Sequence, residues 1–354
     1  MGQSNFIPRL ESLRGVAAVL VAVYHCGVMY LQYPASGSSR LYFAFANGLG
    51  CVVVFFVISG FVLARSLDRA DSISFVSFAR NRAFRLLPAS IAIVGLLTFL
   101  HERFGFYVGF EASFAPINVL LNMLLIKSDI NGVMWSLTVE IAATPLIFMS
   151  VRAYRKHGRT PLLAVAAVLF GLSFVGQYRD LIGANLAPLY AFLAGILVHF
   201  EGPKIARSVS PRTSIWIPVL GIALFLVAGM LKQDAGLMIL MDCIGGALLV
   251  LAISQWPYQR MMKPLDWPPV RFYGRISYSF YLLHMLTVAP AIALGARLFE
   301  DLNPWTTAMT LSMLTILAAA VPALACYKLI EIPGMNLGRR LVGLNGLRNR
   351  AIAQ

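Results

Sequence analysis

Long apolar runs alternate with short polar stretches along this chain of 354 residues. A run of about 20 apolar residues is long enough to cross the hydrocarbon core of a bilayer as an α-helix. Because the runs are uninterrupted and no shorter period competes with the helical one, we expect a polytopic all-α membrane protein with about ten transmembrane helices. The expected spans lie near residues 12–31, 47–66, 86–104, 134–151, 161–177, 185–200, 213–231, 236–256, 273–297 and 306–331.

The pattern also predicts how the chain is divided into membrane-crossing and other parts. The apolar stretch at 115–127 is too short to cross, and it predicts a re-entrant or interfacial piece. No stretch rich in Pro, Gly or Ser separates a second domain, and the residues after the last span are too few for an independent globular domain. We therefore expect one membrane domain over 1–335 and a basic tail over 336–354.

The composition agrees with this pattern. Hydrophobic residues make up 59% of the chain and charged residues only 12%, whereas a soluble domain carries about a quarter charged residues. A membrane β-barrel is excluded because its strands alternate apolar and polar residues with period two.

The charge of +14 is explained by topology. With the N-terminus in the cytoplasm, 23 of the 29 Lys and Arg residues fall on the inner side and 6 on the outer side. Such a bias orients membrane proteins, so both termini are expected in the cytoplasm. Since the basic residues show no groove-reading motif, nucleic acid is not an expected partner.

Three ionisable residues lie where a bilayer disfavours them. At 1.5 Å per residue, His25 and Glu140 lie roughly 20 Å, and His284 roughly 17 Å, from the inner edge of the membrane. Ionisable groups at such depth usually face a bundle interior or a wet cavity and mark function. The simpler alternative is a neutral imidazole that hydrogen-bonds a neighbouring helix. Two such histidines in a chain with five favour chemistry.

A second polar set lies at the expected inner edge of the third span. Arg82 and Arg85 are three residues apart and so share a helix face, with Arg80 beside them. They fit two interpretations: ordinary anchoring to anionic headgroups, or a site for phosphates, which guanidinium groups bind well. On the residues alone, anchoring is favoured.

Two residues carry weaker signals. Ser59 is a candidate nucleophile, although Ser-Gly in a membrane helix more often permits close helix packing. Trp135, at the outer start of a span, fits both an interfacial residue and a substrate platform.

With these residues in this order, the chain resembles the membrane acyltransferase 3 family. Its members are transmembrane O-acyltransferases that modify glycans and some small molecules. The resemblance covers most of the chain and rests on the ordered set rather than on any one piece. Its pieces are Pro8–Ala17 followed by Tyr24 and His25, Phe55–Phe61, Arg80–Pro88, Trp135–Glu140, Gly274–His284 and Glu331–Pro333.

The resemblance implies ten spans in a bacterial inner membrane, an acyl-CoA donor bound from the cytoplasm and a carbohydrate acceptor on the other side. It implies no permanently bound cofactor or metal; acetyl-CoA or another acyl-CoA would be a co-substrate. By position, His25 would be catalytic and Arg14 an essential partner near the donor. Arg82 and Arg85 match an R-x-x-R element of the family, which favours the phosphate interpretation. Many bacterial members carry an additional C-terminal hydrolase-like domain, which is not expected here, so a lipopolysaccharide acceptor is not inferred.

The expected chemistry is general base catalysis, because a sugar hydroxyl is a poor nucleophile until a base removes its proton. His25 is suited to this role, with Glu140 or His284 orienting it or relaying the proton. Ser59 or Tyr281 are candidates for contacting the oxyanion. Direct transfer is favoured, and an acyl-histidine or acyl-Ser59 stays open. The rival interpretation is a proton-coupled transporter or glycan exporter, which predicts inverted repeats and broken helices.

Overall fold

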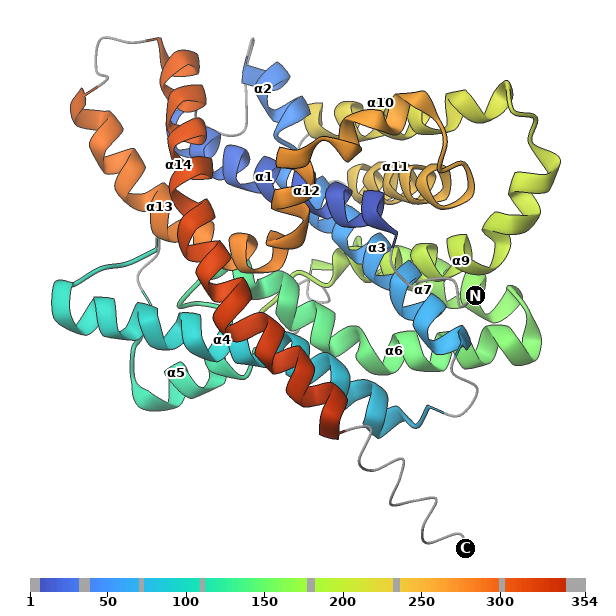
Figure 1. Ribbon diagram of the computed structural model, residues 1–354, viewed down its shortest axis with the longest axis horizontal. Coiled ribbons are helices and arrows are strands. Elements are labelled where there is room, and N and C mark those ends of the chain that lie inside the picture. The colour runs from blue at the N-terminus through green and yellow to red at the C-terminus, as the bar shows by residue number, and fades with distance from the viewer. Residues whose placement is uncertain are drawn as a thin grey trace, which may run out of the picture.

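Helices form every regular element of the described residues, and no strand occurs among them. The computed structural model describes residues 7–31, 39–69, 73–108, 112–176, 182–231, 236–298 and 303–341 (Figure 1). The first half contains α1 (Pro8–Tyr30), α2 (Ser39–Phe45), α3 (Gly48–Arg69), α4 (Phe75–Phe104), α5 (Pro116–Met123), η1 (Gly132–Met134), α6 (Trp135–His157) and α7 (Thr160–Leu172). The second half contains η2 (Ala187–Tyr190), α9 (Ala191–Ser208), η3 (Thr213–Ile215), α10 (Trp216–Met230), α11 (Gly236–Gln255), η4 (Arg260–Asp266), α12 (Pro268–Arg275), α13 (Ser277–Leu298), α14 (Pro304–Cys326) and η5 (Tyr327–Glu331).

Eight helical stretches within the described ranges are long and apolar enough to cross a membrane. Two further expected spans correspond to α7, a shorter apolar helix, and to η2 with α9, which fall outside that set. The expected polytopic all-α class is thus confirmed, and the count of ten stays a prediction. The stretch expected to be re-entrant contains α5, a helix of only eight residues.

Three element bounds differ from those expected. α4 begins at Phe75 rather than near residue 86, because Ser74 caps it by accepting a hydrogen bond from the backbone N–H of Ser77. The ninth expected span is two helices that meet at Ile276. The helix after η5 continues past residue 335, the expected end of the membrane domain, to Leu341; residues 342–354 lie outside the described ones.

The break between α12 and α13 has a packing reason. α12 lies against α1, and the two backbones approach so closely that a Cβ added to Gly15 would be 2.3 Å from the amide nitrogen of Gly274. Small residues permit such approach between membrane helices. α12 therefore rests beside the start of α1 instead of extending α13 (Figure 1).

The centre of the bundle is α3, which packs against α1, α6, α9 and α11. At its crossing with α9, a Cβ on Gly60 would lie 2.0 Å from the carbonyl oxygen of Phe192. The expectation that Ser59-Gly60 permits close helix packing is confirmed at Gly60. α4, α10 and α14 lie outside this centre and expose large apolar side chains, such as Phe99, Leu220 and Leu317, as helices in contact with lipid do.

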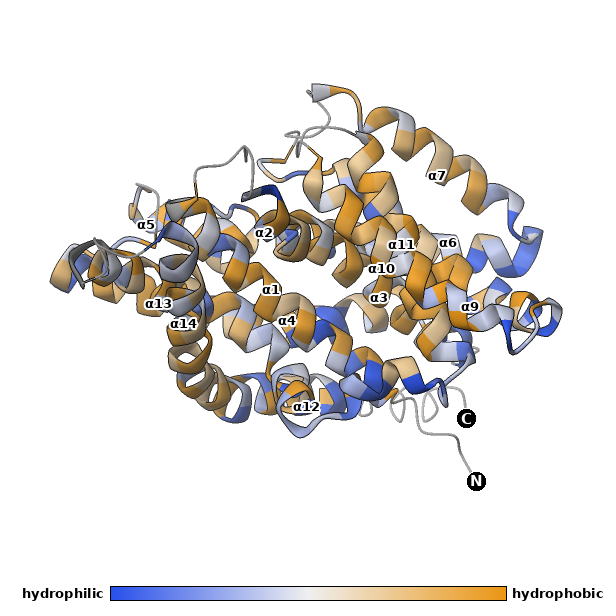
Figure 2. Ribbon diagram, turned by 90° about the horizontal axis from the view of Figure 1, so that it is seen from above, coloured by the Kyte–Doolittle hydropathy of each residue, from blue (hydrophilic) through white to orange (hydrophobic). Residues whose placement is uncertain are grey.

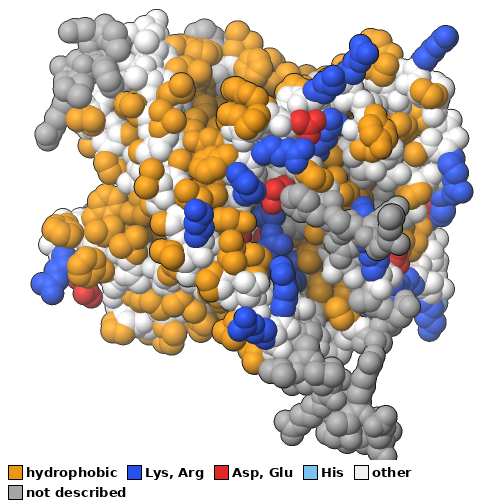
Figure 3. All heavy atoms as spheres, in the orientation of Figure 1, with side chains coloured by type: hydrophobic (Ala, Val, Ile, Leu, Met, Phe, Trp, Pro, Cys, Tyr) orange, Lys and Arg blue, Asp and Glu red, His pale blue; other side chains and the backbone are white. Residues whose placement is uncertain are grey.

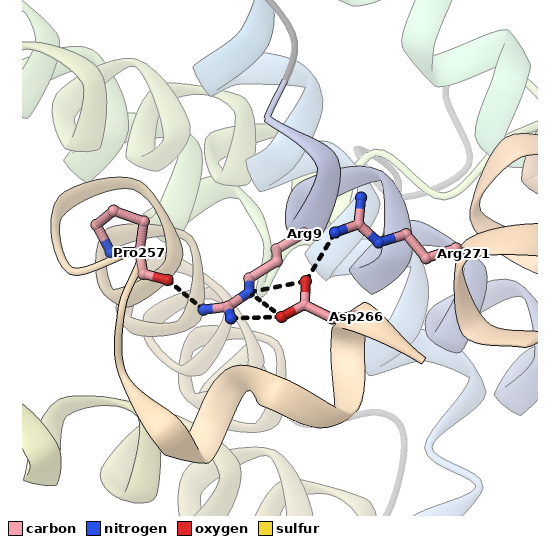
Figure 4. A network of polar contacts seen from close by, with 4 residues as sticks. All are labelled: Arg9, Pro257, Asp266 and Arg271. Carbon is pink, nitrogen blue, oxygen red and sulfur yellow. Dashed lines mark hydrogen bonds and ion pairs between the residues drawn. The ribbon is translucent and has the colours of Figure 1, made fainter. Parts of the chain in front are cut away.

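Hydrophilic residues gather on one side of the molecule, the side that carries α12 (Figure 2). We call this side the basic face; it is the face seen in Figure 3. On it, Arg9 at the start of α1 donates hydrogen bonds to both carboxylate oxygens of Asp266 and to the carbonyl of Pro257, and Arg271 also donates to Asp266 (Figure 4). These bonds hold the pKa of Asp266 below its usual value, Arg9 contributing most. The network fixes η4 and α12 against the base of α1.

Candidate active site

Lys and Arg side chains gather around a hollow in the basic face (Figure 3). A cavity of about 290 Å³ lies among α1, α3, α4, α6 and the helix that follows η5. We call it the arginine cavity, because four arginines and one glutamate line it, an excess of three positive charges: Arg14, Arg82, Arg85, Arg339 and Glu140. A smaller hollow of about 170 Å³ shares Arg14 and Arg85 with it. This distribution favours an anionic ligand.

The buried wall of the arginine cavity is an ion pair between α4 and α6. Arg82 lies 3.4 Å from a carboxylate oxygen of Glu140, and its guanidinium also donates to the backbone carbonyl of Glu140 and to the hydroxyl of Thr144. The Arg82 side chain is 7% exposed. A buried arginine of this kind, with several acceptors in place, holds two helices together. Arg82 therefore ties α4 to α6 as well as lining the cavity.

Ser59 completes this wall from α3. Its hydroxyl donates a hydrogen bond of 3.1 Å to the same carboxylate of Glu140. Ser59 and Glu140, two of the expected catalytic or oxyanion candidates, thus lie together with Arg82, one of the arginines expected to bind the donor. Arg80, the neighbour of Arg82 in the sequence, has a buried Nε atom without a partner and lines none of the cavities described.

The two histidines meet, as their similar depth predicts. The ring centroids of His25 on α1 and His284 on α13 are 5.4 Å apart, with an angle of 33° between the rings. His284 is fully buried, whereas His25 keeps part of its surface accessible. Within the described part of the chain, no hydrogen bond or ion pair joins either ring to Glu140. The expected trio of ionisable groups is thus a histidine pair plus a separate carboxylate.

His284 is held in one orientation. Its Nδ1 atom lies 2.7 Å from the backbone carbonyl of Tyr281, one turn earlier on α13. A carbonyl only accepts, so Nδ1 of the neutral ring carries the hydrogen and Nε2 is left as an acceptor. Nε2 is buried and has no partner. The pair therefore combines an oriented buried acceptor with the accessible ring of His25.

The turn that carries His284 is hydrogen-bonded to the segment between α5 and α6 and to the first turn of α6. The hydroxyl of Tyr281 donates to the carbonyl of Val133 at 2.8 Å and lies 2.9 Å from the Ser136 hydroxyl. The side-chain amide of Asn131 donates to the carbonyl of Leu282 at 3.0 Å. The structure thus gives Tyr281 bonding partners that secure its helix. Its ring centroid is 5.8 Å from that of His284.

Two residues that matter here carried little signal in the sequence. Asn131 is 1% exposed but follows the short apolar stretch at 115–127, for which the sequence predicts only a re-entrant or interfacial piece. Arg339 lines the arginine cavity although it falls in the expected tail. Trp135, for which the sequence predicts an interfacial residue or a substrate platform, packs on the core beside Phe56, with ring centroids 6.4 Å apart. Among the described residues, no group of three His, Cys, Asp or Glu side chains is placed to hold a metal ion.

A comparison with family models decides the relationship of this chain. A model described as an acyltransferase domain matches residues 7–325, nearly the whole chain. The chain belongs to the acyltransferase 3 family. The match contains both histidines and every lining arginine of the cavity except Arg339.

The chain is similar to three named proteins over different shares of their length. An O-acetyl transferase of Shigella phage Sf6 is 28% identical over 55% of this chain and 61% of the relative. Nodulation protein 10 of Rhizobium leguminosarum bv. viciae is 22% identical over 82% of this chain and 83% of the relative. O-acetyltransferase OatA of Staphylococcus aureus (strain NCTC 8325 / PS 47) is 23% identical over 94% of this chain and 58% of the relative. The chain thus spans about three fifths of two of these proteins. No solved structure matches it.

Proposed function

We propose that this protein is a membrane O-acyltransferase that moves an acyl group, in the simplest case acetyl, from acyl-CoA to a hydroxyl of a cell-envelope carbohydrate. The observation that supports the proposal most is that a member of this family places its polar groups in two regions: an arginine-lined cavity on the basic face and a histidine pair inside the bundle. The basic face is, in this proposal, the cytoplasmic face of a bacterial inner membrane, as the positive-inside rule favours.

In this proposal the arginine cavity binds the phosphates of the donor. Arg14 and Arg85 line both hollows of the basic face, and Arg339 adds a further guanidinium from the C-terminal helix. Charge-assisted hydrogen bonds to phosphate are among the strongest that proteins make. The pantetheine arm would then extend from the cavity into the bundle and present its thioester to His25.

His25 is the proposed general base. As the acceptor hydroxyl attacks the thioester carbonyl carbon, His25 takes the hydroxyl proton. The carbon–sulfur bond then breaks, and the imidazolium returns that proton to the departing thiolate. The products are an O-acyl ester and free CoA. His284 Nε2, the oriented acceptor, would accept a hydrogen bond from His25 and so direct its other nitrogen toward the hydroxyl.

Membrane vesicles with the basic face outward test this proposal. Radiolabelled acetyl-CoA, which does not cross the membrane, is added outside, and cell-envelope glycan is enclosed in the lumen. We expect base-labile acetyl ester on the luminal glycan, and none in vesicles that carry His25→Ala. Label only when both substrates share one side would contradict the proposed sidedness. Absence of ester in every arrangement would contradict the O-acyltransferase itself.

A further inference from the structure

A third basic hollow lies beside α6, outside the site described above. Phe148, Arg152 and Lys156 are four residues apart on α6 and so lie on one helix face. Together with Leu67 and Ile73 they line a groove of about 500 Å³. We call it the side groove. It combines apolar walls with basic side chains, which is the chemistry of a site for a phosphorylated organic ligand rather than for a bare ion.

Two arginines of the side groove are held by the protein. The guanidinium of Arg152 lies 4.6 Å from the ring centroid of Phe148 and donates to the carbonyl of Ile73 at 3.4 Å. Arg155 donates to the carboxylate of Asp68 at 3.2 Å. Arginines fixed in this way lose little further side-chain entropy when they bind an anion. The groove therefore has oriented cations before any ligand arrives.

The side groove adjoins the arginine cavity. Ile73 lines both hollows. Phe78, which lines the cavity, has its ring centroid 5.8 Å from that of Phe148, which lines the groove. One extended ligand is therefore able to occupy both hollows.

We propose that the side groove binds the 3′-phosphorylated ribose of the acyl-CoA donor, while the arginine cavity binds its pyrophosphate. This inference rests on the proposed function. CoA carries negative charge in two places, the pyrophosphate and the 3′-phosphate, and the basic face carries two adjacent groups of cations. The arginine cavity, at about 290 Å³, is at the lower limit of pockets that enclose drug-sized ligands. CoA is larger than such ligands and requires additional surface.

A phospholipid headgroup offers the same phosphate chemistry, because basic residues at a membrane edge also bind anionic lipids. The two sources differ in one testable property. A site for the 3′-phosphate distinguishes CoA from 3′-dephospho-CoA, which lacks only that group. A lipid site does not distinguish the two nucleotides, and its effect depends on the lipid composition.

The test is a binding titration of the full chain with CoA and with 3′-dephospho-CoA, in nanodiscs with zwitterionic or anionic lipid. We expect the wild-type protein to bind CoA about tenfold more tightly than 3′-dephospho-CoA, a ratio that corresponds to about 1.4 kcal/mol. Arg152→Gln with Lys156→Gln should remove this preference and leave the affinity for 3′-dephospho-CoA unchanged. The exposed Lys156→Gln alone should reduce the preference, which keeps the test valid if the double variant folds poorly.

Arg207→Gln is the matched control, because it removes the same charge from the last turn of α9 and Arg207 lines none of the described cavities. It should keep the full preference. Equal affinity of the wild-type protein for both nucleotides would overturn this inference alone. A preference that the side-groove variants retain, or that follows the anionic lipid instead of these residues, would also overturn it. Failure to bind either nucleotide would overturn the proposed function with it.

Discussion

The arginine cavity and the histidine pair show two different ways in which a membrane bundle holds polar groups. The cavity opens on the basic face, carries several permanent charges and offsets one of them with the Arg82–Glu140 pair. The histidine pair lies inside the bundle among aromatic rings, and the ring centroid of Phe280 is 6.2 Å from that of His284. Each imidazole is uncharged as long as it carries a single proton. The permanent charges thus line a cavity that opens on one face, whereas the two imidazole rings lie among apolar side chains, where charge is costly.

In the proposed function, this difference separates donor binding from chemistry in space. A ligand phosphate gains from fixed cations, which the cavity supplies. Proton transfer gains from groups whose protonation changes during the reaction, which the histidines would supply in the proposed mechanism. Substitutions in the two regions should therefore alter different kinetic constants.

The largest effect is expected at the histidine pair. His25→Ala removes the proposed base and should lower kcat by about 10²–10⁴, the range that general base catalysis contributes. The affinity for acetyl-CoA should not change, because the arginines proposed to bind its phosphates are untouched. Acetyl transfer measured at saturating donor, together with CoA titration of the same preparation, checks both statements. Wild-type turnover in folded His25→Ala protein would remove His25 from the mechanism.

A smaller effect in a different constant is expected in the arginine cavity. Arg85→Ala should raise KM for acetyl-CoA by about tenfold or more, because loss of a charge-assisted bond to phosphate costs about 1.5–3 kcal/mol. Its kcat should stay near the wild-type value. The measurement is initial rate against donor concentration at fixed acceptor. An unchanged KM would show that Arg85 does not bind the donor and serves only to anchor α4 at the inner edge of the membrane.

Arg82→Ala is the informative companion to Arg85→Ala. Arg82 binds Glu140 and Thr144 of α6, so its removal leaves a carboxylate without its cation and loosens the contact of α4 with α6. We expect lower thermal stability in detergent for this variant, in addition to any rise in KM. Equal stability of the two variants would show that the ion pair contributes nothing to helix packing.

The sequence predicts these two regions unequally. Depth along the spans brings His25 and His284 to one level, and the structure confirms that they meet. The same arithmetic places Glu140 at that level, yet Glu140 contacts Arg82 and Ser59. Depth fixes one coordinate only; helix rotation and lateral position depend on packing such as the Gly60 crossing, which a single sequence does not display.

The fold shows the same limit. The apolar runs predict the helices, because hydrogen-bonding needs in a bilayer leave the chain little choice. They do not predict that α4 begins eleven residues early, since Arg80, Arg82 and Arg85 interrupt the apolar run by which the span is recognised, although Arg82 and Arg85 share a helix face. Nor do they reveal Asn131, whose partner Leu282 lies far along the chain.

The hydrogen bonds that hold α13 at Tyr281 and Leu282 are also expected to contribute to the chemistry. Asn131→Ala removes the bond to the carbonyl of Leu282 and should lower kcat several-fold and shift the pH profile of transfer, with KM for the donor unchanged. Asn118→Ala is the control, because its amide bonds stay within the same segment, to Ser113 and Asp129. Both variants lose buried hydrogen bonds worth about 0.5–1.5 kcal/mol each. An identical loss of kcat in both variants would show that the bond from Asn131 to Leu282 contributes only to the stability of the fold.

The smallest effect is expected at Ser59, which belongs to the arginine cavity by contact and not to the histidine pair. Its hydroxyl donates to Glu140, so Ser59→Ala removes one bond to a carboxylate that keeps Arg82. We expect kcat within about twofold of wild type and a rise in KM of a few-fold at most, consistent with the modest net value of one hydrogen bond. If Ser59 carried the acyl group as a covalent intermediate, the variant would be inactive and wild-type protein quenched with labelled acetyl-CoA would retain label on the peptide that contains Ser59. Rate measurement and peptide mass analysis of the same samples therefore distinguish a wall residue of the donor cavity from a nucleophile.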